Sequence, residues 1–334
     1  MTIRKAGPSC LKRPDTRATG IGPSLTDAGK ILILGGSGYV GSRLRRRLGA
    51  HALATFRRTP FAGGVAFDSM TTNLAEVVDL ASISQAVILF GESNIAACEA
   101  APDKTGAINV TSVIKVINTL RGAGITPLFL SSDAVFPGTA GNYREADLPA
   151  PTLRYGAQKL EVEHYLRDAV DEYLVLRAGK TYDDDPAGGT FLARWLDDIA
   201  SGNTVRLVTD HRFCPIHVDD LVEVIVKALE LRLSGVFHAA GPEETTYWDL
   251  FHQLLDLTGR PADSISVQPA LINDFSTCGE HRPINNSLVS DALFTRAGVV
   301  RRTPEEVCRT LIAKWNAQRL GADAGHGKTA GSLR

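Results

Sequence analysis

The segment KILILGGSGYVGSRLRRRLG, residues 30–49, constrains the fold more than any other part of the chain. Ile31 to Leu34 is a short, fully apolar run, as expected of a buried parallel strand. Glycines follow at positions 35, 36, 38 and 41, and a helical pattern then places apolar residues on one stripe: Val40, Leu44 and Leu48. A strand, a glycine turn and a helix in this order predict the first βα unit of a dinucleotide-binding fold.

The glycines also predict where a phosphate group would bind. They satisfy G-x-G-x-x-G from Gly36 and G-x-x-G-x-x-G from Gly35. The first glycines allow close backbone approach to a pyrophosphate, and the helix N-terminus offers free N–H groups and the positive end of its dipole. The alternative is a glycine turn that holds no ligand. We expect a dinucleotide to be contacted by Gly35, Gly38, Tyr39, Val40 and Gly41.

The end of the second predicted strand favours NADP(H) over NAD(H), although NAD(H) stays possible. The strand runs from about His51 to Phe56 and is followed by Arg57 and Arg58. An NAD site commonly has an acid here for the ribose 2′-hydroxyl, whereas arginines suit a 2′-phosphate. A solvated basic turn is the alternative. Further on, Asp68 ends a short strand and is a candidate for the adenine amino group, or simply forms a turn.

Apolar strands and amphipathic helices continue to alternate, which predicts an α/β, doubly wound parallel sheet. The further strands are expected in the segments QAVILFG, ITPLFLSSDAVFPG and EYLVLRAG. Ligands of such sheets bind at the carboxyl ends of the strands. Ser132 and the start of a helix containing Tyr155 both fall at that edge.

Tyr155 and Lys159 are four residues apart, so their side chains lie on one face of the predicted helix. Alone, this spacing is uninformative. A tyrosine hydroxyl titrates near pH 10, and a nearby ammonium or an oxidised nicotinamide lowers that pKa. Tyr155 could then donate a proton to a carbonyl oxygen while hydride reaches the carbon, with Ser132 bonded to the same oxygen. The glycine loop, this serine and the Y-x-x-x-K pair together predict a catalytic set.

These motifs resemble those of extended short-chain dehydrogenases/reductases, and among them the dTDP-4-dehydrorhamnose reductase group. The likeness runs from about Ile31 to Trp315. It is carried by SSDAVFPGTAGNYREADLPAPTLRYGAQKLEVEHYL, by CPIHVDDLVEVIVKALE with SGVFHAAGPEETTYWDLFHQLL, and by RPINNSLVSDALFTRAGV. The resemblance implies a reductase of a nucleotide sugar. Its implied residues are Ser132, Tyr155 and Lys159 for catalysis, and Asp133 and Arg282 for the substrate. Tyr155 and Lys159 are implied to contact the cofactor as well.

Three positions depart from the group's pattern. Ala134 stands where the group has tyrosine, LFGES (89–93) replaces its N-A-A-A segment, and Lys180 replaces an aromatic residue. Because relatives hold the sugar or nicotinamide near these positions, the cofactor machinery carries over better than the identity of the sugar. Another 4-keto-6-deoxy or modified nucleotide sugar fits as well as dTDP-4-dehydrorhamnose.

The resemblance also implies a division of the chain. We expect a Rossmann domain at 30–178, rejoined by 215–240, and a smaller C-terminal substrate-binding region formed by 179–214 and 241–315. Residues 1–29 and 316–334 are small and polar and are expected to be a disordered leader, or an over-long start, and a disordered tail. Homodimerisation through helices near 107–121 and 152–167 is common in the wider family.

The bulk composition excludes several classes of protein. With 36 basic and 37 acidic residues the net charge is -1, so no general positive field is available for nucleic acid or an anionic membrane. No apolar run approaches the roughly 20 residues that span a bilayer. The odd number of widely spaced cysteines indicates reduced thiols in a cytoplasmic protein. Those cysteines are Cys10, Cys98, Cys214, Cys278 and Cys308.

No metal site is expected. His211, Cys214 and His217 have suggestive spacing, but no second cluster completes a tetrahedral shell. Asp183 to Asp185 read more simply as a solvated acidic loop.

Two further functions compete with the reductase. The first is a nucleotide-sugar epimerase of the same fold. A dehydratase is disfavoured because Asp133 is followed by alanine rather than a second acid. The other alternative is a non-catalytic, NADP-binding regulatory subunit, which the altered LFGES segment and Ala134 leave open, although such a subunit has no need of the Tyr155 and Lys159 pair.

Overall fold

The computed structural model describes residues 29–326, with side chains as far as Leu320. The predicted leader, 1–29, lies outside this range except for Gly29, and so do the last residues, 327–334. A seven-stranded sheet in the order β11-β6-β5-β4-β1-β2-β3 forms the larger lobe, and every pairing in it is parallel. The strands are β1 (Lys30–Leu34), β2 (Ala52–Phe56), β3 (Val65–Ala66), β4 (Ile83–Ile88), β5 (Thr126–Ser132), β6 (Leu174–Ala178) and β11 (Gly235–Ala239). The predicted doubly wound parallel sheet is therefore confirmed.

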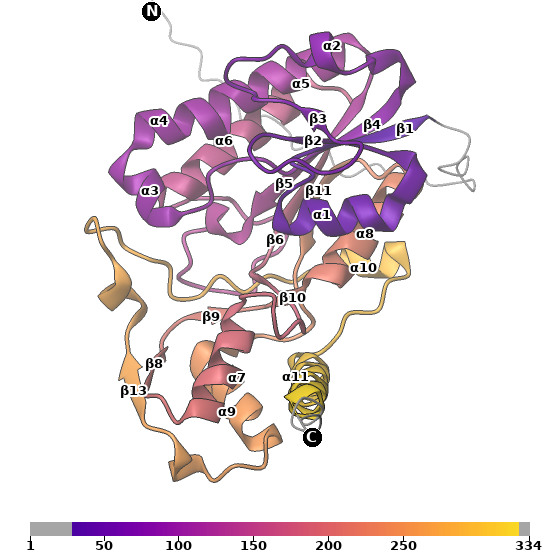
Figure 1. Ribbon diagram of the computed structural model, residues 1–334. Helices are drawn as coiled ribbons and strands as arrows, with labels where there is room; N and C mark the ends of the chain where they lie inside the picture. Colours follow the sequence, from indigo (N-terminus) through magenta and orange to yellow (C-terminus); the bar gives the residue numbers. More distant parts are fainter. Residues whose placement is uncertain (1–28, 327–334) are drawn as a thin grey trace, which may run out of the picture.

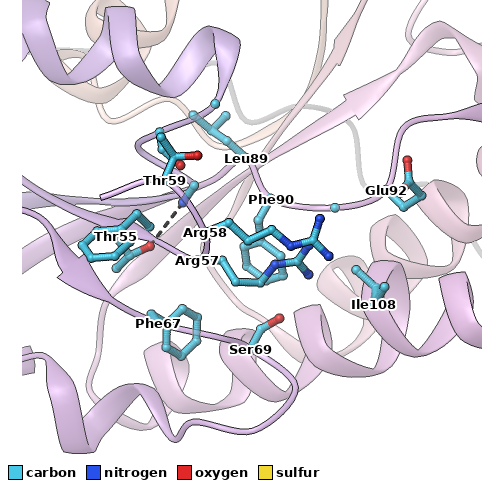
Figure 2. Close-up of a pocket in the computed structure, with 15 residues that line it drawn as sticks. Thr55, Arg57, Arg58, Thr59, Phe67, Ser69, Leu89, Phe90, Glu92 and Ile108 are labelled. Atoms are coloured by element: carbon cyan, nitrogen blue, oxygen red, sulfur yellow. Dashed lines mark hydrogen bonds between the residues drawn. The ribbon is translucent and has the colours of Figure 1, made fainter. Parts of the chain in front are cut away.

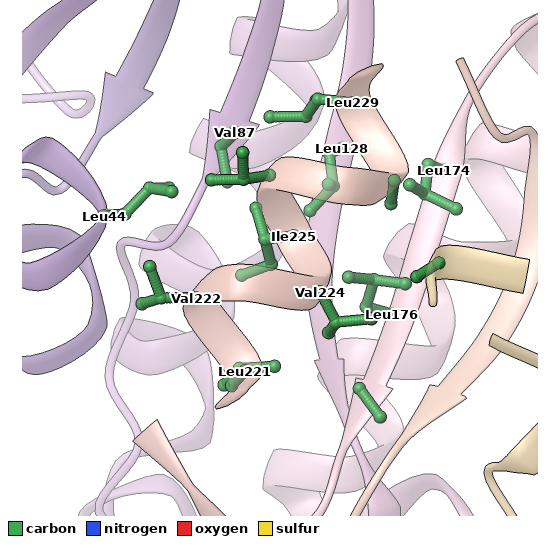
Figure 3. Close-up of a cluster of buried hydrophobic side chains, with 14 of the residues drawn as sticks. Leu44, Val87, Leu128, Leu174, Leu176, Leu221, Val222, Val224, Ile225 and Leu229 are labelled. Atoms are coloured by element: carbon green, nitrogen blue, oxygen red, sulfur yellow. The ribbon is translucent and has the colours of Figure 1, made fainter. Parts of the chain in front are cut away.

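Helices cover both faces of this sheet because its strands are apolar on both sides. In β1, Ile31 and Ile33 join one core while Leu32 and Leu34 join the other, as the two-residue period of a strand requires. Figure 3 shows the first core, where α8 (Val218–Glu230) lays Leu221, Val222 and Ile225 against the strands. The same face carries α1 (Tyr39–Leu48) and α10 (Asp291–Ala297). The opposite face carries α2 (Leu74–Val77), α5 (Ser112–Gly122) and α6 (Arg154–Ala169).

A smaller lobe lies beyond the carboxyl edge of the sheet (Figure 1). Its own core joins α7 (Phe191–Ser201), α9 (Tyr247–Leu257) and α11 (Pro304–His326). Three short strand pairs complete it: β7 (Thr181–Tyr182) with β10 (Ile216–His217), β9 (Arg212–Phe213) with β12 (Thr245–Thr246), and β8 (Val205–Val208) with β13 (Val267–Ala270). A separate apolar core lets this lobe present residues to the sheet edge without interrupting the sheet's own packing.

Two boundaries differ from those predicted. The helix α10, expected in the substrate-binding region, packs on the Rossmann sheet instead, because Leu293, Phe294 and Ala297 are buried against α8 and β11. The helix α11 continues past residue 316 to His326, so the predicted disordered tail is wrong for these residues. Trp315 anchors this helix by donating a hydrogen bond from Nε1 to Asp197 Oδ1 at 3.0 Å.

Short helices and turns connect the strands with the longer helices. The segment after β4 folds as α3 (Ile95–Ala100), α4 (Pro102–Gly106) and a π-helical turn at Ala107–Thr111, which leads into α5. Short 3₁₀ turns lie at Gly49–His51, Leu80–Ser82, Asp133–Val135, Ala262–Ser264 and Ile272–Phe275. Within residues 29–326, no helix is long and apolar enough to cross a membrane.

Gly41 gives the first prediction. A Cβ at this position would lie 2.2 Å from the carbonyl oxygen of Gly35, and backbone cannot move aside cheaply. We expect Gly41→Ala to lower the free energy of unfolding by about 1–3 kcal/mol, measured by denaturant titration. The matched control is Gly122→Ala at the end of α5, where a Cβ meets nothing within 4 Å. That change should be neutral or stabilise by up to about 1 kcal/mol. Equal effects at both glycines would contradict the packing argument.

Candidate active site

The glycine loop is built as a phosphate cradle. Gly35 adopts a φ of 100°, which a side chain rarely allows, and its backbone passes close to Phe90. The Gly36 amide donates to the Thr55 carbonyl at 2.7 Å, and the Gly38 amide donates to Gly35 at 3.0 Å. Helix α1 begins directly afterwards, and its N-cap Gly38 has no side chain to satisfy the first N–H groups. Those groups are therefore available to an anion.

A pocket of about 270 Å³ opens at this loop, at the carboxyl edge of β1, β2 and β4. Figure 2 shows Arg57 and Arg58 extending into it from the end of β2. Ser37 and Thr59 add hydroxyl groups beside these exposed guanidinium groups. The lining consists of Gly35, Ser37, Gly38, Thr55, Phe56, Arg57, Arg58, Thr59, Phe67, Ser69, Leu89, Phe90, Gly91, Glu92 and Ile108. The structure thus brings two of the predicted loop glycines and both predicted arginines into one pocket.

Other predicted cofactor residues lie beside this pocket rather than in its lining. Tyr39 and Val40 open α1, and Gly41 packs under the loop. The pocket wall carries Phe67 and Ser69, while Asp68 lies between them in a turn. The Asp68 carboxylate accepts a hydrogen bond from the Met70 amide at 3.0 Å, so this aspartate forms a turn, the second of its two predicted roles.

The far wall of the pocket was not anticipated from the sequence. Asn109, in the π-helical turn, accepts from the Glu92 amide at 2.7 Å and donates to the Glu92 carbonyl at 2.9 Å. It also donates to Gln158 of α6 at 2.7 Å. The LFGES segment is therefore held by one buried asparagine to the helix that carries Tyr155. An asparagine within an apolar helical pattern was the available signal.

Ser132, Tyr155 and Lys159 meet at the carboxyl end of β5. The Ser132 hydroxyl donates to Asp133 Oδ1 at 2.8 Å and accepts from the Ala134 amide at 3.2 Å. Lys159 Nζ donates to the Leu130 carbonyl at 2.9 Å and lies 5.7 Å from the centre of the Tyr155 ring. The predicted catalytic residues thus form one cluster, and it faces the smaller lobe.

Burial acts in opposite directions on Tyr155 and Lys159 of α6. It raises the pKa of the Tyr155 phenol well above its usual range, with a further rise from the Asp133 carboxylate and a smaller lowering from Ser132. It lowers the pKa of Lys159 to about 8, against an opposing effect of Glu163. The direction for Tyr155 is opposite to that expected from a neighbouring ammonium. At neutral pH the phenol therefore keeps its proton and can act as an acid.

A buried ion pair supports this cluster from below. Arg177 of β6 and Glu163 of α6 are 2.7 Å apart, and each side chain is about one-twentieth exposed. The Ser131 hydroxyl donates to the same carboxylate at 2.5 Å. The strands β5 and β6 and the helix α6 are therefore tied at one point, one residue before Ser132.

The two predicted substrate residues come from different lobes: Asp133 follows β5 of the sheet, and Arg282 belongs to the smaller lobe. Asp133 is partly buried next to Ser132, and burial raises its pKa to about 6 despite the nearby Lys180 ammonium. Arg282, from the smaller lobe, bonds to Glu280 at 3.1 Å. Lys180 is exposed, and Ala134 is buried with its carbonyl against Gly156. Two of the departures from the family pattern therefore flank Asp133.

The residues considered for a metal have other partners. His211 Nδ1 lies 2.9 Å from the Pro283 carbonyl, and His217 Nδ1 lies 2.9 Å from Arg302 Nη1. Asp183 is buried and accepts from Tyr39 Oη at 2.8 Å and from Arg43 at 2.6 Å. This aspartate, expected in a solvated loop, joins the smaller lobe to α1. Among the described residues, no group of three or more histidines, cysteines or acids could hold a metal ion.

The sheet order and the glycine loop define a Rossmann protein with a site at the carboxyl edge of the sheet. The chain belongs to the RmlD substrate binding domain family, which matches residues 29–316. The resemblance to the extended short-chain dehydrogenases/reductases is thereby confirmed.

Several relatives are reductases by name. The chain is 28% identical over 208 residues to the probable low-salt glycan biosynthesis reductase Agl14 of Haloferax volcanii, covering 61% of this chain and 69% of that protein. It is 28% identical over 239 residues to the dTDP-4-dehydrorhamnose reductase of Sinorhizobium fredii, covering 68% and 78%. The methionine adenosyltransferase 2 subunit beta of Pongo abelii is 30% identical over 212 residues, or 61% of each chain.

Solved structures share the fold. The dTDP-4-dehydrorhamnose reductase of Yersinia enterocolitica superposes with a TM-score of 0.73 at 22% identity, covering 85% of this chain and 99% of that one. The enzyme of the same name from Bacillus anthracis, in complex with NADP, gives 0.69 at 18% identity, covering 86% and 99%.

The buried ion pair gives the second prediction. Glu163→Gln leaves the Arg177 charge uncompensated in the interior, so we expect the free energy of unfolding to fall by about 3–5 kcal/mol. The control is Glu305→Gln, which removes an exposed partner of Arg309 and should cost no more than about 0.5 kcal/mol. Denaturant unfolding of both variants measures the difference. A similar small loss in each would show that the buried pair has no special weight.

Proposed function

We propose that this protein is an NADP(H)-dependent reductase of a nucleotide-linked 4-ketosugar. The observation that carries the proposal is the meeting of Ser132, Tyr155 and Lys159 at the same sheet edge as a pocket lined by the glycine loop and two arginines. Membership of the RmlD family and the reductase names of two relatives support it.

The pocket fits NADPH, which would supply the hydride when bound. The N–H groups at the start of α1 would hold the pyrophosphate, and the loop glycines allow its close approach. Arg57 and Arg58 would bind the 2′-phosphate, since guanidinium groups match phosphate oxygens and no acid in the lining occupies the end of β2. Glu92 lies in the lining on the separate loop after β4. NADP(H) therefore fits this pocket better than NAD(H).

The protein's own residues would complete the reduction. As the carbonyl carbon accepts hydride, its oxygen takes the proton from Tyr155 Oη, which yields the alcohol and an ionised tyrosine. The Lys159 ammonium lies on the same helix face and would stabilise that phenolate. Ser132 would hold the oxygen in place, with Asp133 beside it. The nucleotide portion would lie toward the smaller lobe, on the side of Arg282, whose guanidinium is paired with Glu280.

The relatives named as methionine adenosyltransferase subunits favour one second candidate, a non-catalytic subunit that binds the cofactor and regulates a partner enzyme. The intact tyrosine and lysine pair favours the reductase. The predicted homodimer stays a prediction in either case.

The cofactor assignment gives the third prediction. Arg57→Ala and Arg58→Ala each remove a charged hydrogen bond to a phosphate, so each should weaken NADPH binding about 10- to 100-fold while NADH binding changes little. Arg46→Ala is the control, because this exposed arginine on α1 borders a different cavity and the charge change is the same. Fluorescence titration with both cofactors is the measurement. Parallel losses for NADPH and NADH would count against a 2′-phosphate site.

Catalysis gives the fourth prediction. With a panel of nucleotide-linked 4-ketosugars, the wild-type protein should oxidise NADPH, and Tyr155→Phe should lower kcat about 10²- to 10⁴-fold without loss of NADPH binding. Tyr165→Phe is the control on the same helix, where the hydroxyl bonds to Asn118 away from the site. Unchanged turnover in Tyr155→Phe would exclude the mechanism. Tight NADPH binding without turnover of any ketosugar would favour the regulatory subunit.

A further inference from the structure

Ser132 has one proton, and the structure shows where that proton goes. The hydroxyl donates to Asp133 Oδ1 at 2.8 Å and accepts from the Ala134 amide at 3.2 Å. In this state the Ser132 hydroxyl can accept one more hydrogen bond, but it has no further proton to donate. A ketone oxygen can only accept, so Ser132 as it stands offers a carbonyl substrate nothing. An alcohol, which carries a proton, could still donate to it.

An arriving carbonyl would not easily displace this partner. A hydrogen bond to a carboxylate is roughly twice as strong as one between neutral groups. While Asp133 is ionised, the Ser132 hydroxyl therefore keeps donating its hydrogen bond to that carboxylate. A neutral Asp133 reverses the arrangement, because its own O–H can donate to Ser132 Oγ and the serine proton becomes free.

We propose that Asp133 is a positioning residue whose protonation state sets the role of Ser132: neutral Asp133 makes the serine a donor to a carbonyl, and ionised Asp133 makes it an acceptor from a hydroxyl. This inference rests on the proposed reductase function. It assigns the aspartate to the reaction itself rather than to sugar binding alone, and it makes reduction of a ketone depend on a proton held outside Tyr155.

Charged and titratable groups from several elements face Asp133. Lys180 follows β6, whose residue Ala178 pairs with Ser132 in the sheet, so the lysine and the aspartate end neighbouring strands. Tyr155 comes from α6, Tyr247 from α9 and Cys214 from the segment after β9. Burial raises the pKa of Asp133 to about 6, against the hydrogen bond from Ser132 and then the Lys180 ammonium, which both favour the carboxylate.

The expected pH dependence follows from these groups. Neutral Asp133 becomes scarcer above its pKa of about 6, so kcat/KM for ketone reduction should fall with rising pH by up to about tenfold per unit. Lys159, with a pKa of about 8, titrates on a separate and more alkaline limb. The Tyr155 phenol titrates higher still, because burial raises its pKa.

The test compares pH profiles of wild-type protein, Asp133→Asn and Lys180→Met, and it is the fifth prediction. The Asp133→Asn amide can donate to Ser132 at any pH, so the limb near pH 6 should vanish while reduction continues. Lys180→Met removes a cation that favours the carboxylate, so the same limb should move to higher pH. NADPH binding, measured alongside, should be unchanged in both variants. If Asp133 merely oriented Ser132, the fall of kcat/KM near pH 6 would stay in place in both variants. Persistence of that fall in Asp133→Asn would overturn the proposal.

A second measurement separates failure of this inference from failure of the proposed function. The infrared band of a protonated carboxyl group, taken as the difference between wild type and Asp133→Asn, can be followed through pH 6 without any substrate. Appearance of the band as the pH falls through about 6, earlier than for the exposed acids, supports the inference even where no ketosugar is turned over. A carboxylate that stays ionised throughout overturns it, whatever the reductase assay shows.

Discussion

The buried ion pair of Arg177 and Glu163 is the interaction on which the arrangement of the site depends. It ties β6 to α6, and through Ser131 it also ties both to β5. Ser132 directly follows Ser131. On α6, Lys159 lies about one helical turn before Glu163 and Tyr155 about two turns before it. Because a buried charge that loses its partner costs several kcal/mol, the three elements cannot shift independently. The three candidate catalytic residues are thus held through a buried ion pair to which none of them belongs.

A second constraint joins the two lobes. The buried Asp183 carboxylate, at the start of the smaller lobe, accepts hydrogen bonds from Tyr39 and Arg43 in the first turns of α1. This is the helix whose N-terminus would face a pyrophosphate. The lobe that would hold the sugar is therefore fastened to the element that would hold the cofactor. In the proposed reductase, this contact would help to set the distance between the sugar and the nicotinamide, a quantity to which reaction rates are sensitive.

The sequence predicted best what short spacings encode. The glycine loop, the arginines after β2 and the one-face placement of Tyr155 and Lys159 all follow from local periodicity, and the structure places them as expected. Contacts between distant segments were not readable in the same way. The return of α10 to the sheet depends on burial against α8, the link from Asn109 to Glu92 spans a loop, and the bond from Asp183 to Tyr39 crosses between lobes. Asp68 was ambiguous because an aspartate that ends a strand suits a turn as well as a ligand.

The two departures around Asp133 acquire a physical meaning from the hydrogen bonds of Ser132. Lys180, at the end of the neighbouring strand, favours the ionised aspartate, whereas burial favours the neutral form. An apolar residue at position 180 would remove one of the effects that oppose burial, leaving the hydrogen bonds from Ser132 and the Ala134 amide, and would keep the carboxyl group neutral to higher pH. With lysine present, burial still holds the pKa of Asp133 at about 6, so the proposed change between its neutral and ionised forms falls close to neutral pH. In the role proposed for Asp133, such a site would recognise both the carbonyl and the hydroxyl form of one substrate, because a single proton would decide which of them Ser132 binds.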